Sequence, residues 1–384
     1  MNPAFGASSR GGTAPIRPTV TVVVNSVDSL LESTVACGAS DLHVSAGAPP
    51  IVRIHGQMTA VPHEPLTAEF TQQLLFEIMD PAVRARFDQA RDVDFSYEVP
   101  GVVRARCNVY EQSKGISGAF RILPNQIVDL AALGLPETVA RLVELPRGLV
   151  VVTGPPGTGK STTMGALVQH INQTQRKHIL TIEDPIEFRH PNLKSLVSQR
   201  EVGRHTPTFA QALRSALRAD PDVIMVGEMR DPDTMALALT AAATGQLVFG
   251  TLHTMSAAQT VDRILDSFDG ERQAQVRLML AESLKGVLAQ RLIRSSDGTG
   301  RALALEILIG NQPVSALIRE KKTFQLPTII QTGKKDGMQT MDESVIQLVR
   351  AGRISAEDAA PHLTNRELLG AVARPAASPN LRAA

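Results

Sequence analysis

The chain has 384 residues, of which 43% are hydrophobic and 20% charged, and its formal net charge is +1. These values are ordinary for a globular protein, and the length suggests two domains with tails. The near-neutral charge and the aromatic content of 3% argue against a nucleic-acid partner, because such sites use basic surfaces and aromatic stacking. The two cysteines can form neither a disulfide framework nor a four-cysteine zinc site.

Both ends of the chain are rich in small residues and proline. We expect residues 1–20 to form a disordered tail and residues 361–384 to form a flexible one. Residues 1–20 also lack the apolar stretch of a secretory signal, and no run of about 18 apolar residues predicts a membrane span. We therefore expect a cytoplasmic protein that is peripheral at the inner membrane through its partners.

Residues 21–123 have the pattern of a small α+β domain. Val27–Ala36 and Leu66–Met79 carry apolar residues at helical spacing. Ile51–Ile54 and Val102–Val109 alternate between apolar and polar residues as strands do. Glycine and proline mark the turns between these segments.

From residue 131 to residue 360, after a predicted hinge linker at 124–130, apolar strands alternate with helices, which is typical of a parallel α/β sheet. The predicted strands are Gly148–Thr153, Ile179–Ile182, Val223–Val226 and Leu247–Gly250. The predicted helices are Thr162–Asn172, Thr208–Ala219, Pro232–Ala243 and Ala257–Phe268. The end of this domain is expected to be mostly helical, including Glu271–Leu292 and Gln339–Ala351.

The sharpest motif follows the first of these strands and matches the pattern G-x-x-x-x-G-K-[ST] in full. Its glycines let the backbone curl so that successive N–H groups point at phosphate oxygens, and the next helix adds the partial positive charge of its amino terminus. Lys160 is expected to reach the β- and γ-phosphates of ATP, and Ser161 to ligate Mg²⁺. The predicted nucleotide-binding residues are Gly154, Pro155, Pro156, Gly157, Thr158, Gly159, Lys160, Ser161 and Thr162.

Two other strand ends supply the acids that hydrolysis of a phosphate bond requires. The first places Glu183, Asp184 and Glu187 directly after an apolar strand, where Mg²⁺-bound water is a natural partner. The second ends in Gly227 and Glu228, which is similar to a Walker B motif, although aspartate is usual there. Glu228 suits either of two roles, holding Mg²⁺ through water or polarising the attacking water.

A further strand ends at Gly250–Thr254, in the sequence GTLHT. In a RecA-like sheet this places His253 near the γ-phosphate, where it could sense hydrolysis. A lone histidine is more often structural. Both interpretations stay open.

Together these residues make the chain resemble the secretion-superfamily ATPases, and among them the PilT/PilU-type retraction ATPases of type IV pili. The resemblance extends from residue 26 to about residue 360. The matching boxes are Gly154–Ser161 (Walker A), Ile179–Phe188 (Asp box), Asp222–Asp231 (atypical Walker B) and Gly250–Asp262 (His box). Shorter similarities are Ser40–His43 and Ile54–Gly56 in the first domain and Gln331–Asp342 near the end.

The resemblance implies a PAS-like first domain, a RecA-like second domain and a ring of six subunits with ATP between the two domains. It makes Glu187 the candidate catalytic base, with Glu183 in reserve, and assigns Glu228 to magnesium and water. It also implies that guanidinium groups of the first domain complete the site, as they do where they stabilise charge on transferring phosphate. The matching positions, which by themselves read as surface ion pairs, are Arg104, Arg106 and Arg121.

The chain departs from the family pattern at two places. Gln246 stands where a second His-box histidine is often found, which keeps hydrogen bonding but loses titration. In the stretch similar to the retraction motif, Ser315 and Ala316 replace an arginine and an asparagine. Because assembly-type relatives usually carry a four-cysteine zinc element, the two cysteines favour retraction over assembly.

Three functions therefore remain. The leading one is an ATP-driven motor that retracts pili through an inner-membrane platform protein. The second is an accessory subunit that assists a sister ATPase of the same class, which the changes at Gln246 and Ser315 motivate. The third is a RecA-like translocase of nucleic acid, against which charge and aromatic content speak.

Overall fold

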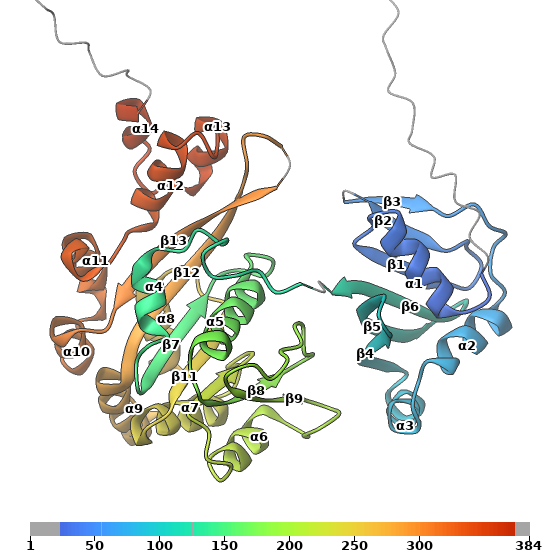
Figure 1. Cartoon of the computed structure of the whole chain (residues 1–384), viewed down its shortest axis with the longest axis horizontal. Helices are drawn as coiled ribbons and strands as arrows, with labels where there is room; N and C mark the ends of the chain where they lie inside the picture. The colour runs from blue at the N-terminus through green and yellow to red at the C-terminus, as the bar shows by residue number, and fades with distance from the viewer. Residues whose placement is uncertain (1–23, 55, 124–125, 299, 373–384) are drawn as a thin grey trace, which may run out of the picture. The chain divides into compact units, whose positions relative to one another are not determined.

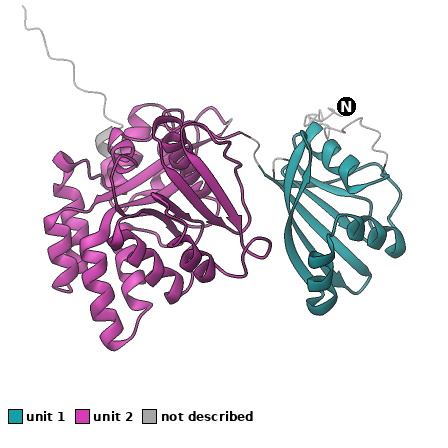
Figure 2. Cartoon of the chain, turned by 60° about the horizontal axis from the view of Figure 1, so that its bottom comes forward, with its two compact units in different colours: residues 1–124 teal, residues 125–384 magenta. Residues whose placement is uncertain are grey.

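The computed structural model describes residues 24–54, 56–123, 126–298 and 300–372. The chain divides into two compact units, Met1–Pro124 and Asn125–Ala384 (Figure 2). The predicted tail at 1–20 lies outside the described residues, and so does His55 of the short first-domain similarity.

The first unit is an antiparallel sheet with helices on one face (Figure 1). Its strands follow the order β3-β2-β1-β6-β5-β4. They are β1 (Asp41–Ser45), β2 (Ile51–Ile54), β3 (Gln57–Ala60), β4 (Asp92–Val99), β5 (Val103–Gln112) and β6 (Gly115–Leu123). The helices are α1 (Val27–Ala36), α2 (Ala68–Glu77) and α3 (Pro81–Ala90). Side chains alternate across strands, and one face buries residues such as Leu42 and Phe120 in a single core with Leu31, Leu75 and Phe87 of the helices.

The helices of the first unit begin where the sequence provides caps. Ser26 forms a capping box with Ser29 before α1. Thr67 accepts a hydrogen bond from the N–H of Phe70 at the start of α2, and Asp80 caps α3. Local sequence therefore fixes the helix starts, and packing on the sheet fixes the rest.

The second unit is a seven-stranded sheet in the order β13-β12-β7-β11-β10-β8-β9. All neighbouring strands are parallel except β12 and β13, which form an antiparallel pair at one edge. The strands are β7 (Gly148–Thr153), β8 (His178–Glu183), β9 (Leu196–Glu201), β10 (Val223–Val226), β11 (Leu247–Leu252), β12 (Leu284–Arg294) and β13 (Arg301–Ile309). The predicted α/β fold is confirmed, with a mixed rather than wholly parallel sheet.

Helices cover both faces of this sheet (Figure 1). Alternate residues of β7 enter two different cores: Val150 and Val152 pack with α5, whereas Leu149 and Val151 belong to the cluster that contains α7 and α8. The helices of the α/β part are α4 (Glu137–Leu142), α5 (Lys160–Thr174), α6 (Phe209–Ala216), α7 (Pro232–Thr244), α8 (Ala257–Asp266) and α9 (Gly270–Ser283). Strands buried on both faces explain the continuous apolar runs of the sequence.

The predicted helix Glu271–Leu292 is wrong beyond Ser283, where α9 ends and β12 begins. Residues 284–294 include leucine, alanine, glutamine and arginine, all good helix formers. Pairing with β7 on one side and β13 on the other overrides that preference. Gly286 lets α4 pack closely on β12, because a Cβ atom at Gly286 would lie 2.8 Å from the Leu142 side chain of α4.

The chain ends in short helices, of which the first ones pack against α8 and α9 and the later ones beside the β12–β13 hairpin (Figure 1). They are α10 (Gln312–Arg319), η1 (Thr323–Gln325), α11 (Leu326–Thr332), η2 (Lys334–Asp336), α12 (Met341–Arg350), α13 (Ala356–Ala359), η3 (Ala360–His362) and α14 (Glu367–Val372). The flexible tail predicted for 361–384 therefore starts too early. Leu363 is buried, and Asp342 accepts hydrogen bonds from the backbone of Thr364 and Asn365; residues 373–384 lie outside the described residues.

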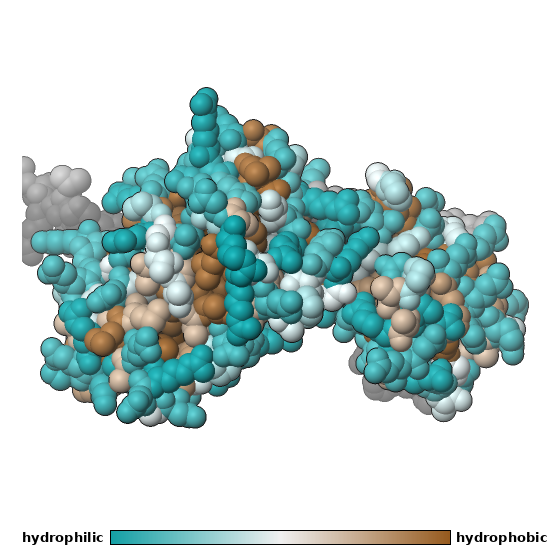
Figure 3. Space-filling view, turned by 90° about the horizontal axis from the view of Figure 1, so that it is seen from below, coloured by the Kyte–Doolittle hydropathy of each residue, from teal (hydrophilic) through white to brown (hydrophobic). Residues whose placement is uncertain are grey.

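The surface seen from below is mostly hydrophilic, with scattered apolar side chains between polar ones (Figure 3). Among the helices of the described segments, none has the length and apolar character that a bilayer crossing needs.

Candidate nucleotide-binding and catalytic site

The loop between β7 and α5 has the conformation that the Walker A pattern predicts. Gly157 and Gly159 adopt φ angles of 79° and 84°, which glycine adopts without strain. Gly154 has φ 146°, and a Cβ atom there would lie 2.6 Å from the backbone oxygen of Gln290 on β12. The loop therefore needs glycine both for its turn and for its fit against the neighbouring strand.

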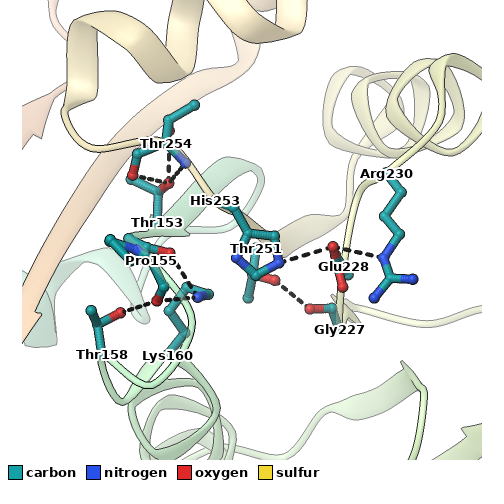
Figure 4. Close-up of polar contacts among 11 residues, drawn as sticks. Thr153, Pro155, Thr158, Lys160, Gly227, Glu228, Arg230, Thr251, His253 and Thr254 are labelled. Carbon is teal, nitrogen blue, oxygen red and sulfur yellow. Dashed lines mark hydrogen bonds and ion pairs between the residues drawn. The ribbon is translucent and has the colours of Figure 1, made fainter.

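Lys160 folds back over this loop. Its Nζ atom donates hydrogen bonds to the carbonyl oxygens of Gly154 and Pro155, over 2.7 and 3.0 Å, and Thr158 Oγ1 donates to Pro155 O over 2.8 Å (Figure 4). Burial lowers the pKa of Lys160, while the nearby carboxylates of Glu228 and Glu187 act in the opposite direction. The cation that would meet phosphate thus lies close enough to interact with carboxylates from both predicted acidic strand ends.

The first acidic segment reaches the start of α5. Ser161 Oγ donates a hydrogen bond to Glu187 Oε1 over 2.9 Å. Glu187 follows the carboxyl end of β8, and Ser161 follows the carboxyl end of β7 by way of the loop, so both strands deliver polar groups to the same edge of the sheet. Ligands bind at this edge in open α/β sheets.

Glu183, the reserve candidate for the base, occupies a different environment. It is 7% exposed, and its carboxylate accepts hydrogen bonds from Thr181 Oγ1 (2.7 Å), Gln199 Nε2 (3.1 Å) and the N–H of Glu187 (3.4 Å). Burial raises the pKa of Glu183 to about 7, against the hydrogen bonds that lower it. Its bonds hold the backbone of the acidic segment, whereas Glu187 contacts the P-loop helix directly.

The second acidic strand end is an ordered cluster (Figure 4). Glu228 Oε1, just beyond β10, lies 2.7 Å from Arg230 Nε and 2.9 Å from His253 Nε2. Burial acts to raise the pKa of Glu228, but Arg230 and His253 outweigh it and hold the pKa below its usual value. The carboxylate is therefore ionised at neutral pH, and His253, which follows β11, lies between it and the Lys160 loop (Figure 4).

Threonines at the strand ends fix the positions of these groups, and sequence patterns did not single them out. Thr153 Oγ1 accepts a hydrogen bond from the N–H of Thr254 over 2.9 Å, and Thr251 Oγ1 donates to the carbonyl of Gly227. Thr254 Oγ1 also lies 2.7 Å from Thr260 Oγ1 on α8. The pattern that could have identified these threonines is a polar residue at the end of an otherwise apolar strand.

Oxygen ligands at this edge suit a magnesium ion. The hydroxyl of Ser161 and the carboxylates of Glu187 and Glu228 are hard oxygen donors, and Mg²⁺ in nucleotide sites is held by few protein groups together with phosphates and water. The Ser161–Glu187 hydrogen bond shows that a hydroxyl and a carboxylate already meet at one point. The assignment of magnesium to Ser161 and Glu228 stays a prediction.

The three arginines of the first unit share one sheet face. Arg104 and Arg106 are two residues apart on β5 and therefore point to the same face, and Arg121 on β6 is the register partner of Arg106. They make ion pairs within the unit: Arg104 Nε lies 3.9 Å from Glu98, Arg106 Nε lies 3.8 Å from Asp94, and Arg121 Nε lies 3.1 Å from Asp41. Their contribution to the nucleotide site stays a prediction.

The departure at Gln246 lies away from the chemical groups. Gln246 precedes β11, whereas His253 follows the carboxyl end of the same strand. Six strand residues separate them, a span of roughly 20 Å at about 3.3 Å per residue. Gln246 Oε1 accepts a hydrogen bond from Thr244 Oγ1 over 3.1 Å. The glutamine thus stabilises local structure at the amino end of β11, opposite to the end that carries the site.

A glycine-rich loop between a buried strand and a helix, with acids from adjacent parallel strands, defines a P-loop nucleoside triphosphatase. Residues 19–361 match the family model described as "Type II/IV secretion system protein", and the chain belongs to that family. It is 50% identical over 333 residues to the type IV pilus retraction ATPase PilT of Pseudomonas aeruginosa, covering 87% of this chain and 96% of the relative.

Two further comparisons agree with that placement. The chain is 36% identical over 335 residues to the type IV pilus ATPase PilU of Pseudomonas aeruginosa, covering 87% of this chain and 88% of the relative. It matches a crystal structure of the pilus retraction motor PilT with bound ADP at a TM-score of 0.82 and 45% identity, covering 89% and 98% of the two chains. The resemblance inferred from the motifs is confirmed.

Proposed function

We propose that this protein is an ATP-hydrolysing motor that powers retraction of type IV pili. The observation that carries the proposal is the meeting of Lys160, Ser161, Glu187 and Glu228 at one edge of the sheet. The high identity to a retraction ATPase over most of both chains supports the same function. Six copies forming a ring, as the family resemblance implied, would turn nucleotide-dependent closure into mechanical work.

The residues divide the work of hydrolysis among them. The P-loop amides and Lys160 bind the phosphates, and Ser161 with Glu228 holds the ion. Bound Mg²⁺ would neutralise charge on the transferring phosphoryl group. Glu187 acts as general base on the attacking water, because its carboxylate lies at the P-loop serine, whereas the buried carboxylate of Glu183 is held by Thr181 and Gln199. His253 orients Glu228.

The arginines of the first unit complete the site in this proposal. Arg104, Arg106 and Arg121 lie on one face of a sheet whose other face is covered by helices. Guanidinium groups in such a row would stabilise the developing charge of the phosphoryl group when a first unit, of the same or of a neighbouring subunit, closes on the bound ATP. The motor would transmit that closure to a platform protein of the inner membrane.

Substitution of the P-loop lysine tests the catalytic proposal. Lys160→Ala should abolish ATP turnover in purified protein, because it removes the ammonium group that contacts the β- and γ-phosphates. Turnover at the wild-type rate would refute the P-loop assignment. Deletion in the host followed by counting of surface pili tests the biological role: excess pili indicate retraction, and bald cells indicate assembly.

A second candidate is an accessory subunit of a mixed motor with a sister ATPase. It is favoured by Ser315 and Ala316 on α10, at the positions where the retraction motif has arginine and asparagine; Ser315 Oγ instead donates to the carbonyl of Ala281 on α9. Purified protein that hydrolyses ATP only when mixed with a sister ATPase would support this role. Robust turnover by the protein alone would favour the motor, and stimulation by DNA or RNA would favour a translocase.

A further inference from the structure

The segment that follows β8 is fastened along one stripe of α5. Glu187 meets Ser161 through the 2.9 Å hydrogen bond. Three residues on, the His190 ring nitrogen Nδ1 lies 3.0 Å from Gln169 Oε1. Between them the Phe188 ring packs against Gly165, where an added Cβ atom would come within 3.0 Å of it. The three positions on α5 are four residues apart, so they share one face of the helix.

Gln199 on β9 holds the same segment from its other side. Its Nε2 atom donates to the carbonyl of Phe188 over 2.8 Å and to Glu183 Oε1 over 3.1 Å. Its Oε1 atom accepts the N–H of His190 over 2.9 Å. One carboxamide therefore forms hydrogen bonds to the backbone directly after Glu187. It also bonds Glu183, which accepts the N–H of Glu187 itself.

We propose that Gln199 is a positioning residue that aims the Glu187 carboxylate at the water bound beside the P-loop. The proposal rests on the assignment of Glu187 as general base. Without Gln199, the backbone between Glu187 and His190 loses two hydrogen bonds on the β9 side. A displacement of about 1 Å in a catalytic group can lower turnover on the order of a hundredfold.

Glutamine is the side chain this place requires. Its carboxamide offers two N–H donors and an oxygen acceptor, and the structure uses both kinds of group. A glutamate there would keep the acceptor but lose both donors, and it would set a second carboxyl group against buried Glu183. Two carboxyl groups in contact share a proton, and the pair repels when both ionise.

The decisive experiment is a double-mutant cycle on purified protein. Gln199→Ala should lower kcat at least about tenfold, while KM for ATP stays near the wild-type value. The double variant Gln199→Ala with Glu187→Gln should turn over no more slowly than Glu187→Gln alone, because Gln199 acts through that carboxylate. A purely structural role would instead add a further loss to the double variant and would overturn the proposal.

The matched control is Ser198→Ala on the same strand. Ser198 Oγ bonds the His178 ring over 3.1 Å, away from the Glu187 segment, so this variant should keep the wild-type kcat. If Glu187→Gln retains wild-type turnover, the assignment of the base fails and this inference fails with it. If Glu187→Gln is inactive while Gln199→Ala behaves like Ser198→Ala, the inference alone fails.

A second variant covers the case in which Gln199→Ala does not fold. Gln199→Glu should show its activity relative to wild type falling as the pH rises from about 6 to about 9, as the carboxyl pair loses its shared proton and the segment is pushed away. The wild-type-to-variant ratio of kcat is the readout. A ratio that does not change with pH would contradict the proposed contact between Gln199, Glu183 and the Glu187 segment.

Discussion

Ser161 Oγ donates to Glu187 Oε1 across 2.9 Å and joins the first turn of the P-loop helix to the acidic segment beyond β8. The serine belongs to the nucleotide motif, whereas the glutamate follows a strand three places away in the sheet, because β11 and β10 lie between β7 and β8. Only the folded sheet brings the two together. The hydroxyl proposed to ligate magnesium and the carboxylate proposed to activate water therefore lie within a single hydrogen bond of each other.

The first prediction separates the two glutamates that flank this segment. Glu187→Gln should lower kcat by about a hundredfold or more with little change in ATP binding, because it removes a base but no phosphate ligand. Glu183→Gln should retain activity within about tenfold, because its oxygen can still accept from Thr181 and Gln199. Steady-state ATPase assays and a nucleotide-binding titration measure both.

The opposite outcome would reassign the base. Inactive Glu183→Gln beside active Glu187→Gln would make the buried carboxyl the catalytic one. Glu187→Ala is the size control for the first variant: loss of the base by either substitution should give the same kcat within a few-fold.

The second prediction concerns stability and pH. Burial gives Glu183 a folded-state pKa of about 7, above its usual value of 4.5. Between those two pH values the folded protein binds more protons than the unfolded protein, so this group makes the protein less stable as the pH rises through that window. A shift of this size corresponds to about 3 kcal/mol at high pH.

Glu183→Gln removes that titration. The melting temperature of the variant minus that of the wild type should be larger at about pH 8 than at about pH 5, by several degrees. Thermal melts of the apo protein at both pH values provide the test. A difference between the two proteins that is constant with pH would show that Glu183 is ionised in both states.

Much of this site could be predicted from the sequence. The strand Gly148–Thr153 and the strand Val223–Val226 were found with their observed bounds, since runs buried on both faces are apolar throughout. The P-loop was found because its pattern is local. What sequence could not show were contacts of single side chains between different elements, such as those of Gln199 on β9 with Glu183 and Phe188.

The error at Leu284–Arg294 has the same origin. Those residues favour helix by themselves, and only their partners β7 and β13 make them a strand. The strand matters to the site, because Gln290 on it donates a hydrogen bond to Thr163 Oγ1 of α5 over 2.7 Å. Its backbone oxygen also occupies the position that a side chain at residue 154 would need. Gln290 could therefore not be predicted as part of the site from the sequence alone.

The third prediction tests the cluster around Glu228. Arg230→Ala removes the cation that, with His253, holds the pKa of Glu228 below its usual value. The pKa of Glu228 should rise, so the acidic limb of the pH profile for kcat should move to higher pH. His253→Ala should move it in the same direction. Arg214→Ala, on the remote helix α6, is the control and should leave the profile unchanged.

The last prediction follows from the packing of the P-loop on β12. Gly154→Ala would place a methyl group 2.6 Å from the carbonyl oxygen of Gln290, at a φ of 146° that other residues rarely adopt. Since the clash is with backbone, the loop must shift, and we expect ATP affinity to fall at least about tenfold. Fluorescent-nucleotide titration measures the loss. Gly245→Ala has a comparable φ of 133° but no atom within 4 Å of the added methyl group; it should bind ATP as the wild type does, and equal losses in both variants would show that backbone strain, and not the contact with β12, is responsible.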